Sequence, residues 1–319
     1  MTVASGPLVD IIIPTRNRAE LTAQAVDSVV RQSYRNWRLL VVDDGSDSTE
    51  LRKLTSCLPS DSRIQLITHR TSSGAQAARE TGLLRSTADL IAFLDSDDLW
   101  HPSKLERQVS LLLDKSSSSS RTLVICGYHW IAEDGSTRRT AIPTDADVFT
   151  YRNMSSPLMT RDALVSAGGV RRPDDARLPI GEHIDLFLRL FQTAQVLVVS
   201  EPLVSCRDHG GTRNSAQPPE VGAAAFAELI RRHRHFLRTE APALYHDLSL
   251  RAGGRFLAAG QLVAALRHLA VAARFGSMSG RIGLLRTVGS ITRRRPFRPS
   301  RMWREACPLL AGPSPSLAR

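Results

Sequence analysis

The sequence predicts an α/β protein with a mostly parallel central sheet flanked by helices, followed by a C-terminal helical extension. Two patterns indicate this class. Short apolar segments alternate with segments of helical periodicity over roughly the first 215 residues, which is typical of parallel strands joined by right-handed crossovers. From about Gln217 to Phe275 the composition changes to helical sequence rich in Ala, Leu and Arg. With 319 residues and 42% hydrophobic content, the chain can build one large domain or two smaller ones.

The first half of the chain contains four predicted strands separated by helices. Each strand is an apolar run that ends at polar or turn-forming residues. Strands are expected at residues 9–14, 37–42, 64–68 and 90–94, and helices at residues 17–32, 49–54, 74–85 and 103–113. We expect a capping box at the first helix, with Asn17 as the N-cap and Glu20 three residues later.

The remaining sequence completes the sheet and adds the extension. Further strands are expected at residues 122–128, 155–160 and 196–199, and further helices at residues 161–167 and from Glu182 onward. The predicted division of the chain is a domain at 1–215 with halves at about 8–115 and 120–215, a helical extension at 216–278, and a basic, poorly ordered tail at 279–319.

An acidic cluster follows the strand expected at residues 90–94. Asp95 and Asp97 are two residues apart, so in a locally extended chain both side chains project to the same side and can share one cation. Mg²⁺ typically takes one or two carboxylates together with substrate phosphates. Asp98 is expected only to cap the following turn. The alternative is a buried strand followed by an acidic turn without a ligand, because Asp is common in turns.

Two other polar clusters are expected beside this one. All three follow directly on strand ends, at residues 15–17, 43–46 and 95–98. In a parallel sheet the carboxyl ends of the strands lie along one edge, and ligands of open α/β folds bind beyond those ends. Three clusters at one edge are harder to explain as ordinary turns than any one of them alone.

The charge and cysteine content bound the environment of the protein. The net charge is +11, and the stretch from Arg281 to Glu305 contains eight arginines and a single acid. Such a block predicts an anionic surface as its partner, or else a solvated basic tail. The four cysteines have no metal-ligand spacing, and no signal segment or long apolar run is present. We therefore expect a cytoplasmic protein, with peripheral contact at the inner face of an anionic membrane through the tail.

Several ordered motifs resemble glycosyltransferase family 2. They are I-I-I-P-T-R-N-R at 11–18, V-V-D-D-G-S at 41–46, A-A-R-E-T-G at 77–82 and F-L-D-S-D-D-L-W-H-P-S-K-L at 93–105. The resemblance continues through E-x-x-D-L-F-L-R-L at 182–190 and E-P-L-V at 201–204, so it covers residues 8–215. It implies a GT-A fold, a nucleotide-sugar donor, a divalent metal and inversion at the anomeric carbon. The first half of the domain would then bind the nucleotide and the second half the acceptor.

The resemblance also implies roles for single residues. The nucleotide sugar would be held by residues of the matching motifs: Pro14, Thr15, Asn17, Asp43, Asp44, Arg79, Asp95 and Ser96. Thr15 and Asp43 are expected at the base and ribose, whereas Asp44 is a weaker candidate. Arg79 would approach the nucleotide, and its alternative is a charge on the surface of a helix.

The same resemblance implies a metal site for Mn²⁺ or Mg²⁺. Asp97 would contact the metal directly, and Asp95 would contact the ribose or a metal-bound water. His209 lies where relatives carry a histidine near the diphosphate or metal, although a lone histidine is more often structural.

The expected catalytic base departs from the family pattern. Many relatives have Glu-Asp where this chain has Glu182-His183, and that Asp is their usual base. Histidine also titrates near neutral pH and can take a proton. We therefore expect Glu182 or His183 as the base with Asp185 as support, and the substitution can also signal altered or lost activity. No Q-x-x-R-W motif of processive synthases is evident, which favours single additions.

The leading hypothesis is a transferase that moves a sugar, UDP-linked in the first instance, to a hydroxyl acceptor. The acceptor would be a surface polysaccharide, a lipid-linked saccharide or a small molecule. A nucleotidyltransferase is disfavoured, because Pro14 to Asn17 contains no glycine for a phosphate loop. A non-catalytic nucleotide- or carbohydrate-binding protein remains an alternative. Nucleic acid is not an expected partner. Single-stranded nucleic acid is bound by aromatic side chains on which the bases stack, and the basic tail contains only two aromatic residues, Phe297 and Trp303.

Overall fold

The computed structural model describes residues 6–115, 120–132, 134–144, 148–150, 153–171, 178–207 and 218–276. The chain forms two compact units, the first built from Met1–Ala176 with Glu182–Gly210 and the second from Arg177–Gly181 with Gly211–Arg319. The predicted domain boundary near residue 215 and the basic tail lie outside the described residues, so both stay predictions.

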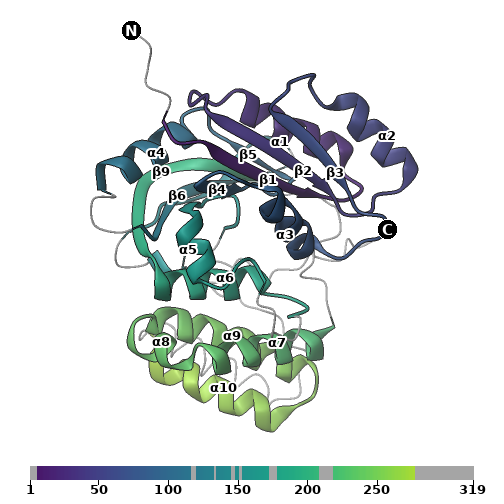
Figure 1. The fold of residues 1–319 in the computed structure, drawn as a ribbon. Helices are drawn as coiled ribbons and strands as arrows, with labels where there is room; N and C mark the ends of the chain where they lie inside the picture. The colour runs from purple at the N-terminus through teal and green to yellow at the C-terminus, as the bar shows by residue number, and fades with distance from the viewer. Residues whose placement is uncertain are drawn as a thin grey trace. The chain divides into compact units, whose positions relative to one another are not determined.

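The first unit contains a nine-stranded sheet whose first half is parallel (Figure 1). The order is β3-β2-β1-β4-β8-β6-β9-β5, and β7 pairs with β6. Neighbours in the first four positions are parallel, as the sequence predicted. These strands are β1 (Val9–Thr15), β2 (Trp37–Asp43), β3 (Ile64–Thr68) and β4 (Leu90–Phe93).

The second half of the sheet is mixed. Its strands are β5 (Asp98–Trp100), β6 (Thr122–Ile131), β7 (Thr137–Ala141), β8 (Leu158–Thr160) and β9 (Gln195–Arg207). β6 and β9 are parallel, whereas β8 is antiparallel to β4 and β6, β5 to β9, and β7 to β6. The sequence missed β5, which has three residues, and β7, whose burial pattern is mostly exposed. Neither strand carries the apolar run that identified the others.

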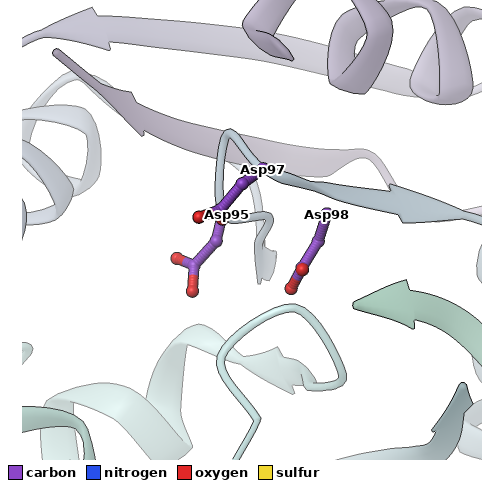
Figure 2. Close-up of side chains that lie close together, drawn as sticks. All are labelled: Asp95, Asp97 and Asp98. Atoms are coloured by element: carbon purple, nitrogen blue, oxygen red, sulfur yellow. The ribbon is translucent and has the colours of Figure 1, made fainter. Parts of the chain in front are cut away.

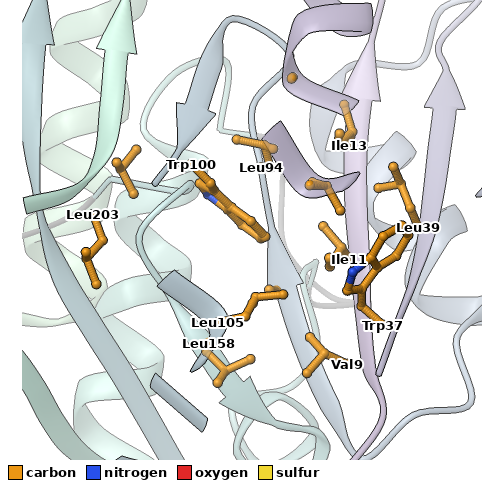
Figure 3. Packing of buried hydrophobic residues seen from close by; sticks show 14 of the residues in the cluster. Val9, Ile11, Ile13, Trp37, Leu39, Leu94, Trp100, Leu105, Leu158 and Leu203 are labelled. Atoms are coloured by element: carbon orange, nitrogen blue, oxygen red, sulfur yellow. The ribbon is translucent and has the colours of Figure 1, made fainter. Parts of the chain in front are cut away.

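Successive side chains of β1 point to opposite faces of the sheet, and all of them are buried, so helices cover both faces. Val9, Ile11 and Ile13 belong to one core cluster with residues of α1 (Ala19–Val30) and α4 (Lys104–Lys115). Figure 3 shows part of this cluster. On the opposite face α3 (Ala75–Arg85) packs so closely that a Cβ at Gly82 would lie 2.5 Å from Ile12 Cγ2. A strand buried on both faces places its carboxyl end beside α1 and α3 together.

The remaining elements of the first unit complete this layer structure. They are α2 (Ser48–Cys57), a short 3₁₀ helix (Val148–Thr150), α5 (Arg161–Ser166) and α6 (Glu182–Thr193). The three buried isoleucines of β1, Ile11, Ile12 and Ile13, each contribute about 1.5–3 kcal/mol on burial, so the strand itself is a major source of stability.

The predicted capping box at α1 is wrong. The N-cap is Arg18, with no side-chain cap, and the Ala19 amide donates instead to Glu50 Oε2 at 3.0 Å. Asn17 has φ 51° and its Oδ1 accepts the Asp47 amide at 2.9 Å. Asn17 therefore ties the β1–α1 loop to the β2–α2 loop, a long-range contact that a local pattern cannot reveal.

The second unit is helical where described, as the composition indicated. Its helices are α7 (Pro219–Arg232), α8 (Arg234–Thr239), α9 (Pro242–Ala258) and α10 (Leu262–Phe275). Leu229, Leu244 and Leu248 are fully buried, and Leu269 is 3% exposed. Among the described residues, none of the helices combines the length and apolar character needed to cross a bilayer.

Candidate functional site

The carboxyl end of β4 leads into an acidic turn, residues Asp95 to Asp98. The Asp98 amide donates to the Asp95 carbonyl oxygen at 3.0 Å, which closes the turn. Carboxylate oxygens of Asp95, Asp97 and Asp98 lie within 4.8 Å of one another (Figure 2). The expectation of a locally extended chain is therefore wrong, and it is the turn that gathers the three acids.

Asp98 begins β5 rather than capping a turn. It lies opposite Cys206 of β9, and its Oδ2 accepts the Ser155 hydroxyl at 2.6 Å. Burial, reinforced by the charges of Asp97 and Asp95, raises the pKa of Asp98 well above its usual range. Asp98 is 7% exposed, whereas the side chains of Asp95 and Asp97 are 34% and 23% exposed. The latter two are thus the acids accessible to a ligand.

Arginines hold the two accessible acids. Arg79 Nη2 of α3 contacts Asp95 Oδ1 at 2.5 Å, and Arg18 Nη1 contacts Asp97 Oδ2 at 2.8 Å. Arg79 is 6% exposed, so the alternative of a surface charge is wrong. Its Nε is buried without a hydrogen-bond partner among the described residues. A buried donor left unpaired costs about 1–3 kcal/mol, and the contact of Arg79 with Asp95 is made despite this cost.

The Ser155 hydroxyl supports the turn from the other side. Its oxygen accepts the Asp95 amide at 3.0 Å, and it donates to Asp98. The carbonyl of Ser155 accepts the Trp100 indole N–H at 2.8 Å, and the Lys104 ammonium lies 4.0 Å from the Trp100 ring centroid. Lys104 is fully buried, and this burial lowers its pKa to about 8. A dense buried network therefore fixes the turn.

The predicted residues of the β2–α2 loop are engaged within the chain. The Asp43 carboxylate accepts the Ser46 amide at 3.0 Å and the Ser46 hydroxyl. Gly45 has φ 72°, and a Cβ there would lie 2.7 Å from the Ser72 backbone nitrogen. The backbone turns tightly at Gly45, which allows this loop to approach Thr71 and Ser72.

Asp44 organises the neighbouring loop. Burial opposes its ionisation, but hydrogen bonds from residues of that loop outweigh burial and lower its pKa; the donors are the Ser73 amide, Ser72 hydroxyl, His69 ring and Gly74 amide. These contacts, at 2.7–2.9 Å, satisfy the buried carboxylate of Asp44 within the chain, so its burial needs no ligand to explain it. Its predicted contact with the nucleotide stays a prediction.

The other predicted nucleotide residues lie around the acidic turn. Pro14 and Thr15 end β1, and the Thr15 hydroxyl is 2.6 Å from that of Thr22. Ser96 is 4% exposed within the turn. His209 lies outside the described residues.

The N-terminal turn of α6 carries the predicted base residues. Glu182 and His183 are partly buried, and Glu182 has no hydrogen-bond partner among the described residues. Asp185 is 4% exposed, and its Oδ2 accepts from Arg189 Nε at 2.8 Å. Arg189 also donates to the carbonyls of Gly169 and Val170 at 2.7 and 3.1 Å. Asp185 therefore orients α6 through Arg189.

A connection through Val170 links α6 to the acidic turn. The Val170 carbonyl also accepts from Gln76 Nε2 of α3 at 3.0 Å. Because α3 carries Arg79, α6 and the acidic turn are attached to one common element. The link consists of contacts among four separate segments: α6, the loop at Val170, α3 and the acidic turn. No sequence pattern predicts it.

Replacing Asp185 by Ala is expected to destabilise the first unit by about 3 kcal/mol, because removing one partner leaves a buried guanidinium uncompensated. Urea denaturation followed by tryptophan fluorescence measures this loss. Unchanged stability together with lost turnover would assign Asp185 to the chemistry instead.

Among the described residues, three that contact the acidic turn were missed as site residues. They are Arg18, Ser155 and Arg207, whose Nε donates to the Asp97 carbonyl at 2.6 Å. Arg18 ends the motif at residues 11–18, and Arg207 follows the motif at residues 201–204. Their positive charge in or near a motif was the signal that could have identified them. Ser155 lies 57 residues from Asp98 in sequence and carried no signal.

The turn suits a divalent cation. Two accessible carboxylates supply hard oxygen ligands, which Mg²⁺ and Mn²⁺ prefer. The guanidinium of Arg79 lies beside these acids, with its Nη2 2.5 Å from Asp95 Oδ1.

A family model and relatives of known sequence each match part of the chain. Residues 10–127 match the sequence model of Glycosyl transferase family 2. UDP-Glc:alpha-D-GlcNAc-diphosphoundecaprenol beta-1,3-glucosyltransferase WfgD of Escherichia coli is 45% identical over 112 residues, 35% of this chain and 43% of that protein. The putative teichuronic acid biosynthesis glycosyltransferase TuaG of Bacillus subtilis (strain 168) is 36% identical over 129 residues, 40% of this chain and 50% of that protein. The chain spans about half the length of these relatives.

Solved structures match almost the whole chain. The mannosyltransferase PcManGT from Pyrobaculum calidifontis, in complex with GDP-Man and Mn²⁺, has TM-score 0.57 at 20% identity and covers 96% of this chain and 86% of its own. S. aureus TarS 1–349 in complex with UDP-GlcNAc has TM-score 0.58 at 16% identity, covering 91% and 93%. These likenesses confirm the GT-A α/β fold.

Proposed function

Because residues 10–127 place this chain in glycosyltransferase family 2, we propose that it transfers a sugar from a nucleotide-sugar donor to a hydroxyl acceptor, with inversion. The observation that carries the proposal is the acidic turn, where Asp95 and Asp97 remain accessible beside the buried guanidinium of Arg79. A carboxylate pair next to a buried arginine suits a diphosphate with its counter-ion.

The residues divide the work of such a reaction. Asp97 and Asp95 would hold Mn²⁺ or Mg²⁺, and a bound cation of this kind neutralises charge on a departing diphosphate. Thr15 and Asp43 would contact the base and ribose. Glu182 is the first candidate to take the proton of the acceptor hydroxyl, because its carboxylate is partly buried and unengaged among the described residues. His183 is the second.

The donor and acceptor are proposed from the relatives. UDP is the first nucleotide to test, since WfgD is named for UDP-Glc and TarS was solved with UDP-GlcNAc, and GDP follows from PcManGT. A lipid-linked saccharide is the first acceptor, because WfgD is named for GlcNAc-diphosphoundecaprenol. Such an acceptor is consistent with action at the inner face of the membrane, where the Arg-rich tail would contact anionic lipid.

Calorimetry with UDP, GDP, dTDP and CMP tests the donor site. We expect one nucleotide to bind at least about tenfold more tightly with Mn²⁺ than with EDTA, because cation and phosphate share the site. Asp97→Asn should lose this metal dependence. Asp114→Asn, which removes an exposed acid of α4, is the matched control and should retain it. Binding of no nucleotide under either condition would contradict the proposal.

A further inference from the structure

Arg18 pairs with one carboxylate oxygen of Asp97, an acid proposed to hold the cation. Its Nη1 lies 2.8 Å from Asp97 Oδ2, and the two side chains are 28% and 23% exposed. A dication bound to Asp97 would lie beside this guanidinium, and like charges so close repel strongly. Cation binding and the ion pair of Arg18 with Asp97 therefore compete.

The backbone around Arg18 is fixed independently of this ion pair. Its carbonyl accepts both the Thr22 amide at 2.9 Å and the Thr22 hydroxyl at 2.7 Å. The following amide, of Ala19, is held by Glu50. The long side chain of Arg18 can consequently change partners by rotation about its own bonds while the loop stays in place.

The acidic turn is likewise fixed without Arg18. The carbonyl of Asp97 is held by Arg207, and the turn itself is closed by the bond between Asp98 and Asp95. Arg79 differs from Arg18 in this respect, because its side chain is only 7% exposed and packed against Asp95. Of these two arginines that pair with accessible acids, Arg18 has the more exposed side chain, at 28% against 7% for Arg79.

We propose that Arg18 exchanges partners when the donor binds: it neutralises Asp97 in the free protein and contacts the donor diphosphate once a cation holds Asp97. This inference rests on the proposed function. A guanidinium released next to a diphosphate finds paired oxygens that match its fork of N–H donors. In the free protein the charge of Asp97 is thereby compensated next to Asp95 and Asp98, and the bound state gains a charge-assisted contact.

The exchange predicts opposite effects of one substitution on two ligands. Arg18→Gln removes the competitor for Asp97, so affinity for Mn²⁺ alone should rise about threefold or more. The same variant lacks the diphosphate contact, so affinity for UDP or GDP at saturating Mn²⁺ should fall about tenfold, as expected for loss of one charge-assisted hydrogen bond. Arg18→Lys keeps the charge and should restore part of the nucleotide affinity.

Isothermal titration calorimetry of the full chain measures both quantities. Arg31→Gln is the matched control, because it removes the same charge from the other end of α1, where Arg31 is 68% exposed and pairs with Asp27. It should change neither affinity by more than about twofold. Thermal unfolding of each variant checks that the fold is retained.

The outcomes separate the two proposals. If wild-type protein binds UDP or GDP with Mn²⁺, loss of affinity for both ligands in Arg18→Gln would show a merely structural role and overturn the exchange. Unchanged affinities would overturn it as well. Wild-type protein that binds none of UDP, GDP, dTDP and CMP would overturn the proposed function and the exchange together.

Discussion

Glu182→Gln is expected to lower the turnover number of sugar transfer about 100- to 10,000-fold, the usual contribution of a positioned general base. Donor affinity should stay within about twofold, because the donor contacts proposed here come from β1, β2, α3 and the acidic turn. The assay would use UDP-Glc with GlcNAc-diphosphoundecaprenol as the first substrate pair, and donor binding would be measured by calorimetry.

Two variants give this experiment its controls. Glu201→Gln removes a 48% exposed carboxylate of β9 and should leave turnover within about twofold. His183→Ala tests the second candidate base. A large loss of turnover in His183→Ala with near-normal turnover in Glu182→Gln would identify His183 as the base instead of Glu182. Full activity in both variants would remove this end of α6 from the chemistry.

A protein that binds donor without turning it over would be a different case. The chain has His183 where many relatives have the Asp that serves as base. Donor binding with no transfer by wild-type protein across saccharide, lipid-linked and small-molecule acceptors would favour the non-catalytic binding protein.

Asp10→Ala is expected to destabilise the first unit by about 3–5 kcal/mol, the cost of breaking a buried ion pair. Asp10 of β1 is fully buried, and Arg38 donates to both its oxygens at 2.9 and 2.7 Å. Its Oδ2 also accepts the Ser86 hydroxyl and the amides of Thr87 and Ala88. All of these donors lose their acceptor in the variant.

The stability difference should depend on pH in a defined direction. Burial alone would raise the pKa of Asp10, but the hydrogen bonds from Arg38, Ser86 and the two amides outweigh burial and lower it below 3.8. A carboxyl group with a lowered pKa stabilises the fold fully above its unfolded pKa, and this stabilisation is lost as pH falls through the folded pKa. The difference between wild type and variant should therefore be constant near neutral pH and shrink below about pH 4.

Urea denaturation followed by tryptophan fluorescence measures this difference, since Trp37 and Trp100 are buried in the first unit. Asp61→Ala is the matched control, because Asp61 also binds an arginine through both oxygens but at the surface. It should cost about 1 kcal/mol or less. Equal losses in the two variants would show that burial does not decide the contribution of Asp10.

The sequence by itself determined the class of fold and the position of the acids. Apolar runs such as Ile11–Ile13 and Leu90–Phe93 predict strands because a run of apolar residues is visible in the local sequence. The motifs placed Asp95 and Asp97 at the end of a strand and Arg79 on the helix before that strand. The confirmed α/β GT-A fold follows from this alternation. Short strands without apolar runs, such as β5, escaped prediction for the same reason.

Only the tertiary structure decided what these side chains contact. Asp98 is buried because Ser155 and β9 close over it, Arg79 is buried because α3 packs tightly on β1, and Arg18 reaches Asp97 across 79 residues of sequence. Partners so far apart in the chain leave no periodic or local pattern, since a hydrogen bond depends on distance in space. The sequence therefore located the acidic turn, and packing determined which of its acids are buried, which are paired and which are accessible.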